Sequence, residues 1–153
     1  MKVGVIGSGG REHALCFSLK SSNKVKKIYC FPGNAGTSSL ATNIDIDIND
    51  FEKLKDFIIQ NNIDLIVIGP EKPLVNGLAD ELRALSIPVV GPSKSAAILE
   101  ESKIASKQFM QAVGIPTARC TWHDGIESAL QGLDNWSATD GVVIKSDALA
   151  GGK

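Results

Sequence analysis

The stretch VGVIGSGGREHAL, residues 3–15, determines the fold that the rest of the chain is expected to adopt. Val3 to Ile6 form a short apolar run that indicates a buried strand, glycines follow at once, and Ala14 to Leu19 continue as a helix. A strand, a tight turn and a helix in this order are typical of the first unit of an α/β protein. The ligand that such a turn holds depends on GSGGREH, residues 7–13.

β-rich segments alternate with helical segments along residues 1–92. The IDLIVIG run has almost no polar residue, which favours a central strand covered on both sides. Strict alternation predicts a parallel, doubly wound α/β sheet of the Rossmann-like kind. Strands are predicted for KKIYCF (26–31), 44–48, IDLIVIG (63–69) and IPVVG (87–91), and helices for 51–62, capped by Asp50 and with Phe51, Leu54, Phe57 and Ile58 on one face, and from Pro73 to about Leu85.

Four glycine-rich loops follow these strands. They are GSGGREH (7–13), PGNAGT (32–37), GPEKPLVNG (69–77) and GPSKSAA (91–97). Ligands of open parallel sheets bind at the carboxyl ends of the strands, where such loops gather. The four loops are therefore expected to converge on one edge of the sheet.

The first loop does not satisfy the requirements of a dinucleotide site. Glu12 occupies the third glycine position of the fingerprint, and the second strand ends in YCF (29–31), where an acid should bind the ribose. NAD binding by an oxidoreductase is therefore disfavoured.

A single phosphate requires less of the same loop. Successive backbone N–H groups at a helix N-terminus and one guanidinium suffice, and Gly9, Gly10 and Arg11 offer that set. The alternative is that the glycines only permit a tight turn, with Arg11 and Glu12 in solvent. His13 is more often a packing residue than a catalyst at such a position.

Composition excludes several other classes of protein. The chain has 153 residues with 16 basic and 17 acidic side chains, so no net field draws it to nucleic acid or to an anionic membrane. No signal peptide or membrane span is expected. Cys16, Cys30 and Cys120 form no C-x-x-C pair, which predicts reduced core thiols in a cytoplasmic protein. The sequence leaves the oligomeric state open.

A different pattern begins after Gly91. Residues 93–114 carry two helical patterns, the second from about Ser102 to Val113. In residues 115–153 we expect a strand at ARCTW (118–122), a short helix at GIESALQGL (125–133) and a strand at GVVIK (141–145) that runs into a glycine-rich loop. The predicted organisation is thus a substrate-binding domain over 1–92, linking helices over 93–114 and an incomplete unit over 115–153.

Taken together, five spaced motifs resemble the phosphoribosylamine-glycine ligase family of purine biosynthesis. They are GSGGREHAL (7–15), PGNAGT (32–37), GPEKPLVNG (69–77), GPSKSAAILEESK (91–103) and VIKSDALAGGK (143–153). The match covers the whole chain but only about the amino-terminal third of the family's protein. The resemblance implies a pre-ATP-grasp domain followed by the opening of an ATP-grasp domain.

The family's reaction implies the ligands. ATP and Mg²⁺ activate the glycine carboxylate as an acyl phosphate, which the amine of phosphoribosylamine attacks to give glycinamide ribonucleotide. By resemblance Gly9, Gly10 and Arg11 bind the substrate together with Asn34, Gly36 and Thr37 of the second loop. Glu71 is placed to accept hydrogen bonds from ribose hydroxyls or the amine; the alternative is an acid favoured by a helix N-terminus.

For ATP the resemblance implies Lys103 and Lys145, whose ammonium groups suit polyphosphate oxygens. The alternative for Lys103 is a solvated helix face shared with Ser102 and Lys107. The family usually reads KADGLAAGK where this chain reads KSDALAGGK, and Ala148 and Gly151 in changed positions put the fit of that loop over ATP in question.

The resemblance places the catalytic groups and the magnesium ligands beyond Lys153. The chain is therefore expected to be an amino-terminal fragment that is inactive alone, whether by natural truncation or by proteolysis. The alternative function is a non-catalytic module that binds a phosphorylated sugar or a nucleotide, and a downstream ATP-grasp continuation would separate the two.

Overall fold

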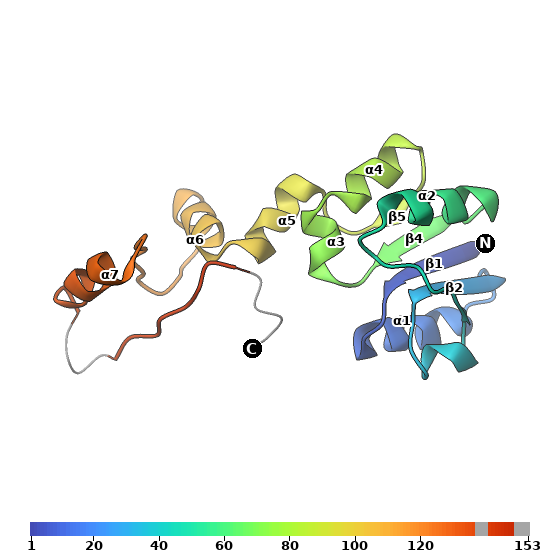
Figure 1. Ribbon diagram of the computed structural model, residues 1–153, viewed down its shortest axis with the longest axis horizontal. Coiled ribbons are helices and arrows are strands. Elements are labelled where there is room, and N and C mark those ends of the chain that lie inside the picture. Colours follow the sequence, from blue (N-terminus) through green and yellow to red (C-terminus); the bar gives the residue numbers. More distant parts are fainter. Residues whose placement is uncertain (137–140, 149–153) are drawn as a thin grey trace. The chain divides into compact units, whose positions relative to one another are not determined.

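The computed structural model describes residues 1–136 and 141–148, and Gly151 of the predicted phosphate loop lies outside them. The chain divides into two compact units, Met1–Ala97 and the described residues from Ile98 onward. The elements of the first unit are β1 (Lys2–Gly7), α1 (Gly10–Lys20), β2 (Lys27–Pro32), the short 3-10 helix η1 (Thr37–Ser39), β3 (Thr42–Asn43), α2 (Phe51–Gln60), β4 (Leu65–Ile68), α3 (Glu71–Val75), α4 (Leu78–Ala84) and β5 (Val89–Val90), followed by the start of α5 (Lys94–Glu101) (Figure 1).

The first unit contains the parallel sheet that the alternation predicts. Its strand order is β3-β2-β1-β4-β5, and every pair is parallel. Val5 of the central strand pairs with Cys30 on one side and with Val67 on the other. The chain thus starts in the middle, builds outward through β3, crosses back and builds the other half, which confirms the doubly wound α/β fold.

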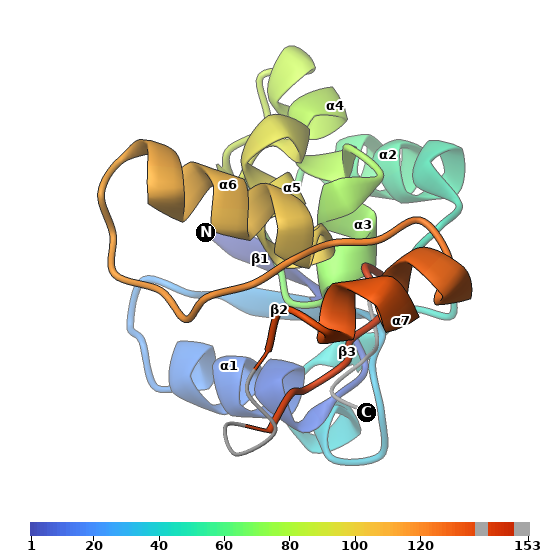
Figure 2. The same cartoon turned by 90° about the vertical axis from the view of Figure 1, so that its left-hand side faces the viewer.

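Helices cover both faces of this sheet. On one face α1 buries a small cluster with Val5, Ile28 and the two cysteines Cys16 and Cys30. The other face carries the larger core beneath α2, α3 and α4. Figure 2 shows α1 on the opposite side of the sheet from these three helices.

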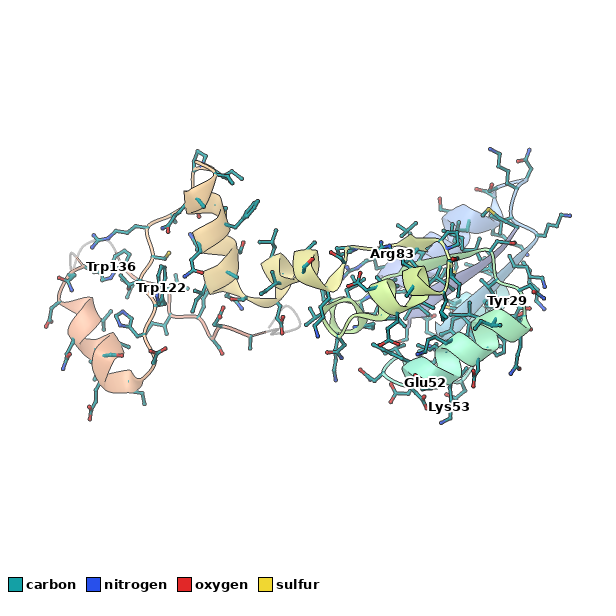
Figure 3. All side chains as sticks on the ribbon, turned by 90° about the horizontal axis from the view of Figure 1, so that it is seen from above. Tyr29, Glu52, Lys53, Arg83, Trp122 and Trp136 are labelled. Atoms are coloured by element: carbon teal, nitrogen blue, oxygen red, sulfur yellow. The ribbon has the colours of Figure 1, made fainter. Side chains whose placement is uncertain are left out.

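The helix α2 forms as its sequence predicts. The Asp50 carboxylate caps it by accepting from the Lys53 N–H at 3.2 Å. Phe57 packs edge-on against Tyr29 and Phe31 of β2, with ring centroids 5.5 and 5.4 Å apart. Figure 3 shows Glu52 and Lys53 on the side of α2 that faces away from the sheet.

Two predicted elements of the first unit are wrong in their bounds. The strand expected at 44–48 is only Thr42–Asn43, because pairing with β2 ends there, although Ile44, Ile46 and Ile48 still pack on the core. The helix expected from Pro73 to Leu85 begins at Glu71 and is divided into α3 and α4. Gly77 lies between them with φ +99°, a conformation that helical residues do not adopt.

The described part of the second unit contains helices joined by irregular segments. Its helices α6 (Lys103–Ala112) and α7 (Ile126–Leu133) confirm two predictions, and Ser102 caps α6 by accepting from the Ala105 N–H at 3.0 Å. The strands expected at 118–122 and 141–145 are wrong, since both segments are irregular. A strand needs a neighbour for its backbone groups, and Val143 and Ile144 are each 81% exposed.

No helix among the described residues is both long and apolar enough to span a membrane.

Candidate functional site

Three of the four glycine-rich loops are joined at the carboxyl edge of the sheet. We call residues 7–13, 32–37 and 69–71 the rim. Asn34 of the second loop donates through Nδ2 to the carbonyl oxygens of Ser8 and Gly9, at 2.8 and 3.2 Å. Arg11 donates through Nη1 to the carbonyl oxygen of Gly69 at 3.1 Å. The first loop is therefore tied to the second and to the third by side chains that the sequence singles out.

The second loop is held by its own polar groups. The buried Thr37 donates through Oγ1 to the Asn34 carbonyl at 2.9 Å, and its N–H donates to Asn34 Oδ1 at 2.9 Å. Asn43 of β3 binds the same two residues, because its Nδ2 donates to the Asn34 carbonyl and its Oδ1 accepts from Thr37. Asn34 and Thr37 thus shape the loop from within.

Gly36 of the same loop lies against His13 of α1. A Cβ at Gly36 would come within 2.7 Å of the imidazole ring, so a side chain there would require His13 to move. His13 itself is exposed. The structure therefore adds an imidazole to the rim beside a predicted binding residue.

Arg11 and Glu71 form an ion pair across the rim. Arg11 Nη2 lies 3.0 Å from Glu71 Oε1, and the two side chains are 65% and 36% exposed. A hydrogen bond from its own backbone N–H and then the one from Arg11 hold the pKa of Glu71 below its ordinary value. Because Glu71 is also the first residue of α3, the helix N-terminus favours its charged form as well. A guanidinium and a carboxylate thus stand side by side at the water-exposed edge.

Gly9 and Gly10 occupy the start of α1, with Gly9 as the N-cap. The Gly9 N–H donates to Glu12 Oε2 at 2.6 Å, and Glu12 is only 4% exposed. The N–H groups of the first helical turn have no intrahelical acceptor and point out of the helix end. Sequence reasoning did not place Glu12 in the site; its position three residues after an N-cap, where acids commonly reach back, is the signal that could have found it.

The fourth loop, residues 91–97, contacts α3 and α4. The Lys94 N–H donates to Asp80 Oδ2 of α4 at 2.8 Å, and a Cβ at Gly91 would lie 2.8 Å from Leu74 of α3. These contacts fix the loop after β5 against the helical layer.

One predicted ATP lysine, Lys103, belongs to a polar cluster of the second unit, and the other, Lys145, precedes the cluster residue Asp147 by two positions. Lys103 Nζ donates to the Ala148 carbonyl at 2.7 Å, and Asp147 accepts from Ser102 Oγ at 2.9 Å and from the Ile104 N–H at 3.1 Å. The segment that carries Lys145 is thereby fastened to the N-terminus of α6. Lys145 is exposed in an irregular segment.

The ammonium group of Lys107 forms hydrogen bonds within the protein, so this side chain is not part of a fully solvated helix face. Its Nζ donates to Thr117 Oγ1 at 2.6 Å and to the Ala118 carbonyl at 2.7 Å. Within residues 1–136 and 141–148, no group of three His, Cys, Asp or Glu side chains is arranged to hold a metal ion.

Fold and rim define an α/β domain of the Rossmann-like class, with polar groups at the carboxyl edge of a parallel sheet. Residues 1–100 match the family model described as phosphoribosylglycinamide synthetase, N domain, and the chain belongs to this family.

Its relatives carry the corresponding enzyme name. The chain is 48% identical over 154 residues to a phosphoribosylamine–glycine ligase of Caldanaerobacter subterraneus subsp. tengcongensis, with all of this chain and 36% of that protein covered. It is 41% identical over 153 residues to the enzyme of that name from Clostridium acetobutylicum, with the same coverage. The chain thus spans about a third of the length of these relatives.

Solved structures agree on the fold. The crystal structure of phosphoribosylamine–glycine ligase from Thermotoga maritima superposes with a TM-score of 0.76 at 33% identity, covering 100% of this chain and 34% of that one. N5-carboxyaminoimidazole ribonucleotide synthetase from Thermus thermophilus superposes with a TM-score of 0.65 at 21% identity, covering 89% and 36%, and shares the fold.

Proposed function

We propose that this chain is the amino-terminal part of an ATP-dependent ligase that joins glycine to phosphoribosylamine, giving glycinamide ribonucleotide. In this proposal the rim binds the phosphoribosyl substrate, residues 1–92 form the substrate-binding domain, 93–114 link it to the ATP-grasp unit, and 115–153 begin that unit. The family membership and the names of the relatives support this assignment. The three free cysteines support a place in the reducing cytoplasm.

The observation that carries the substrate site is the Arg11–Glu71 pair beside the N-terminus of α1. A guanidinium next to first-turn N–H groups suits a phosphate, and a carboxylate 3.0 Å away suits hydroxyl or amine donors. A 5-phosphorylated ribose with an amine carries both kinds of group. Gly9, Gly10, Gly36, Asn34 and Thr37 contribute backbone groups and loop shape in this proposal.

We assign ATP to the second unit. Lys103 and Lys145 would hold its phosphates, and the cluster around Asp147 keeps the segment of Lys145 near α6. ATP with Mg²⁺ supplies the phosphoryl group that activates a carboxylate for attack by an amine. Among the described residues, no group of His, Cys, Asp or Glu side chains is arranged to hold the Mg²⁺.

Calorimetric titration with ribose 5-phosphate tests the substrate site. Arg11→Ala removes a charge-assisted contact of typically ~1.5–3 kcal/mol, which raises Kd by about one to two decades. Lys24→Ala is the matched control, because Lys24 binds the N-terminus of the chain through its carbonyl at the opposite edge of the sheet. An unchanged affinity in Arg11→Ala would remove Arg11 from the site.

A further inference from the structure

Glu12 fills the place where three glycines meet. A Cβ at Gly7 would lie 2.7 Å from the carboxyl carbon of Glu12, and one at Gly9 would lie 2.9 Å from Oε2. A Cβ at Gly69, on the third loop, would overlap Oε1. These three positions are free of side chains, and the room they leave is taken by the protein's own carboxylate.

This carboxylate is buried and bonded. Glu12 is 4% exposed, and its Oε2 accepts from the Gly9 N–H at 2.6 Å. A charge-assisted bond of this length is among the stronger hydrogen bonds in proteins. The Gly9 N–H is therefore committed within the protein, and the conformation of the turn depends on Glu12.

A dinucleotide-binding turn uses the same positions differently. There the second glycine lets the backbone approach the pyrophosphate, and the third lets the helix pack closely on the strand. In this chain Gly7 and Gly9 hold the first two positions, whereas Glu12 holds the third and reaches back to Gly9. A pyrophosphate seated on this turn would meet an occupied donor and a fixed negative charge.

We infer that Glu12 is the specificity-determining residue of the rim. It positions Gly9 and Gly10, and it excludes diphosphate ligands while leaving the first turn of α1 and Arg11 for a single phosphate. This inference rests on the proposed phosphoribosyl site. This role of Glu12 explains why the GSGG turn, residues 7–10, resembles a dinucleotide-binding turn but does not bind dinucleotides.

Two substitutions separate charge from space. Glu12→Gln keeps the length of the side chain and an oxygen that accepts from Gly9, and it removes the charge. Glu12→Gly removes the side chain and restores the G-x-G-x-x-G spacing over residues 7–12. Glu52→Gln on the outer side of α2, where the side chain is 83% exposed, is the matched control.

The measurement is the ratio of two dissociation constants, for ADP-ribose and for ribose 5-phosphate, by calorimetric titration of the whole chain. Wild type and Glu52→Gln are expected to prefer ribose 5-phosphate by about tenfold or more, since one like-charge contact is sufficient for that. Glu12→Gln should reduce the preference severalfold, and Glu12→Gly should abolish or reverse it. A general loosening of the fold would weaken the binding of both ligands and leave the ratio of their dissociation constants unchanged.

The outcomes are distinguishable. If wild type binds ribose 5-phosphate and the ratio stays constant in both Glu12 variants, the role of Glu12 is refuted and the phosphoribosyl site stands. If wild type binds neither ligand, or prefers ADP-ribose, the proposed site fails and this inference fails with it. Circular dichroism checks folding, and if Glu12→Gly is unfolded, the ratio in Glu12→Gln alone decides.

Discussion

Replacing Asn34 by alanine should damage both the stability of the first unit and the shape of its rim. The substitution removes three hydrogen bonds: two from Nδ2 to the carbonyls of Ser8 and Gly9, and one to Oδ1 from the Thr37 N–H. The first two acceptors lie at the exposed edge, where water can replace the amide. Thr37 is fully buried, so its N–H has no such replacement.

The magnitude follows from this difference. An unsatisfied buried donor costs about 1–3 kcal/mol, whereas each exposed bond contributes about 0.5 kcal/mol. We therefore expect Asn34→Ala to lower the free energy of unfolding by about 2–4 kcal/mol, which for a unit of this size lowers Tm by about 10–30 °C. Urea denaturation followed by far-ultraviolet circular dichroism suits the measurement, because Trp122 and Trp136 both lie in the second unit.

Two further variants test this expectation, one that keeps the bond to Thr37 and one that serves as a control. Asn34→Asp keeps an oxygen for the Thr37 N–H but loses the two bonds to the first loop, so it should cost only about 1 kcal/mol of stability. Because both variants lose the connection to the first loop, Asn34→Asp and Asn34→Ala should weaken the binding of ribose 5-phosphate equally. Asn23→Ala, at an exposed position, should change stability by less than about 0.5 kcal/mol. A loss in Asn34→Ala no greater than in Asn23→Ala would refute the argument that Asn34 joins the loops.

Three other measurements address separate features. Burial, followed by the neighbouring Cys30, raises the pKa of Cys16 to about 12, and burial also raises the pKa of Cys30, so both thiols stay protonated near neutral pH. A disulfide reagent should therefore titrate only the half-buried Cys120 before unfolding, and a second fast thiol, or a fast phase that survives Cys120→Ser, would contradict this. Because the pKa of Glu71 is lowered in the folded state, its contribution to stability is present above its ordinary pKa and is lost as pH falls through the folded value. The stability advantage of wild type over Glu71→Gln, at most about 0.5–1 kcal/mol for so exposed a pair, should therefore decline as pH falls below the ordinary carboxyl pKa of 4.5, and a difference that does not change with pH would exclude the ion pair as its source. Asp147→Ala should speed tryptic cleavage after Lys145, because Asp147 holds this segment against Ser102 and Ile104. The control Asp124→Ala, at an exposed position, should leave the cleavage rate unchanged, and equal rates in both variants would mean that other contacts hold the segment.

The features that sequence reasoning predicted are those coded by neighbouring residues. The order of strands and helices, the cap at Asp50 and the loops of the rim all follow from patterns within a few positions. The predicted strands at 44–48, 118–122 and 141–145 failed because a strand forms only where a partner of suitable register is available, and local alternation does not report the partner. Two of the three cysteines are buried as expected, whereas Cys120 is half-buried.

The pairings within the rim could not be read from the chain for a related reason. Arg11 and Glu71 are 60 residues apart, and Asn34 is 26 residues from Ser8. Only the parallel register of β1, β2 and β4 brings their loops to one edge. The identity of the polar residues was therefore predictable, but their partners were not.

The exposure of the Arg11–Glu71 pair determines how easily a substrate phosphate can replace Glu71 at the Arg11 guanidinium. An ion pair with side chains 65% and 36% exposed contributes at most about 1 kcal/mol, because water and salt screen it. It nevertheless keeps the guanidinium at the rim, since Nη1 is also bonded to the Gly69 carbonyl. In the proposed complex a phosphate, which bears more charge than one carboxylate, displaces Glu71 from the guanidinium at little cost. Glu71 is then released to accept from the hydroxyl or amine groups of the same ligand, so one weak internal contact is replaced by two contacts to the substrate.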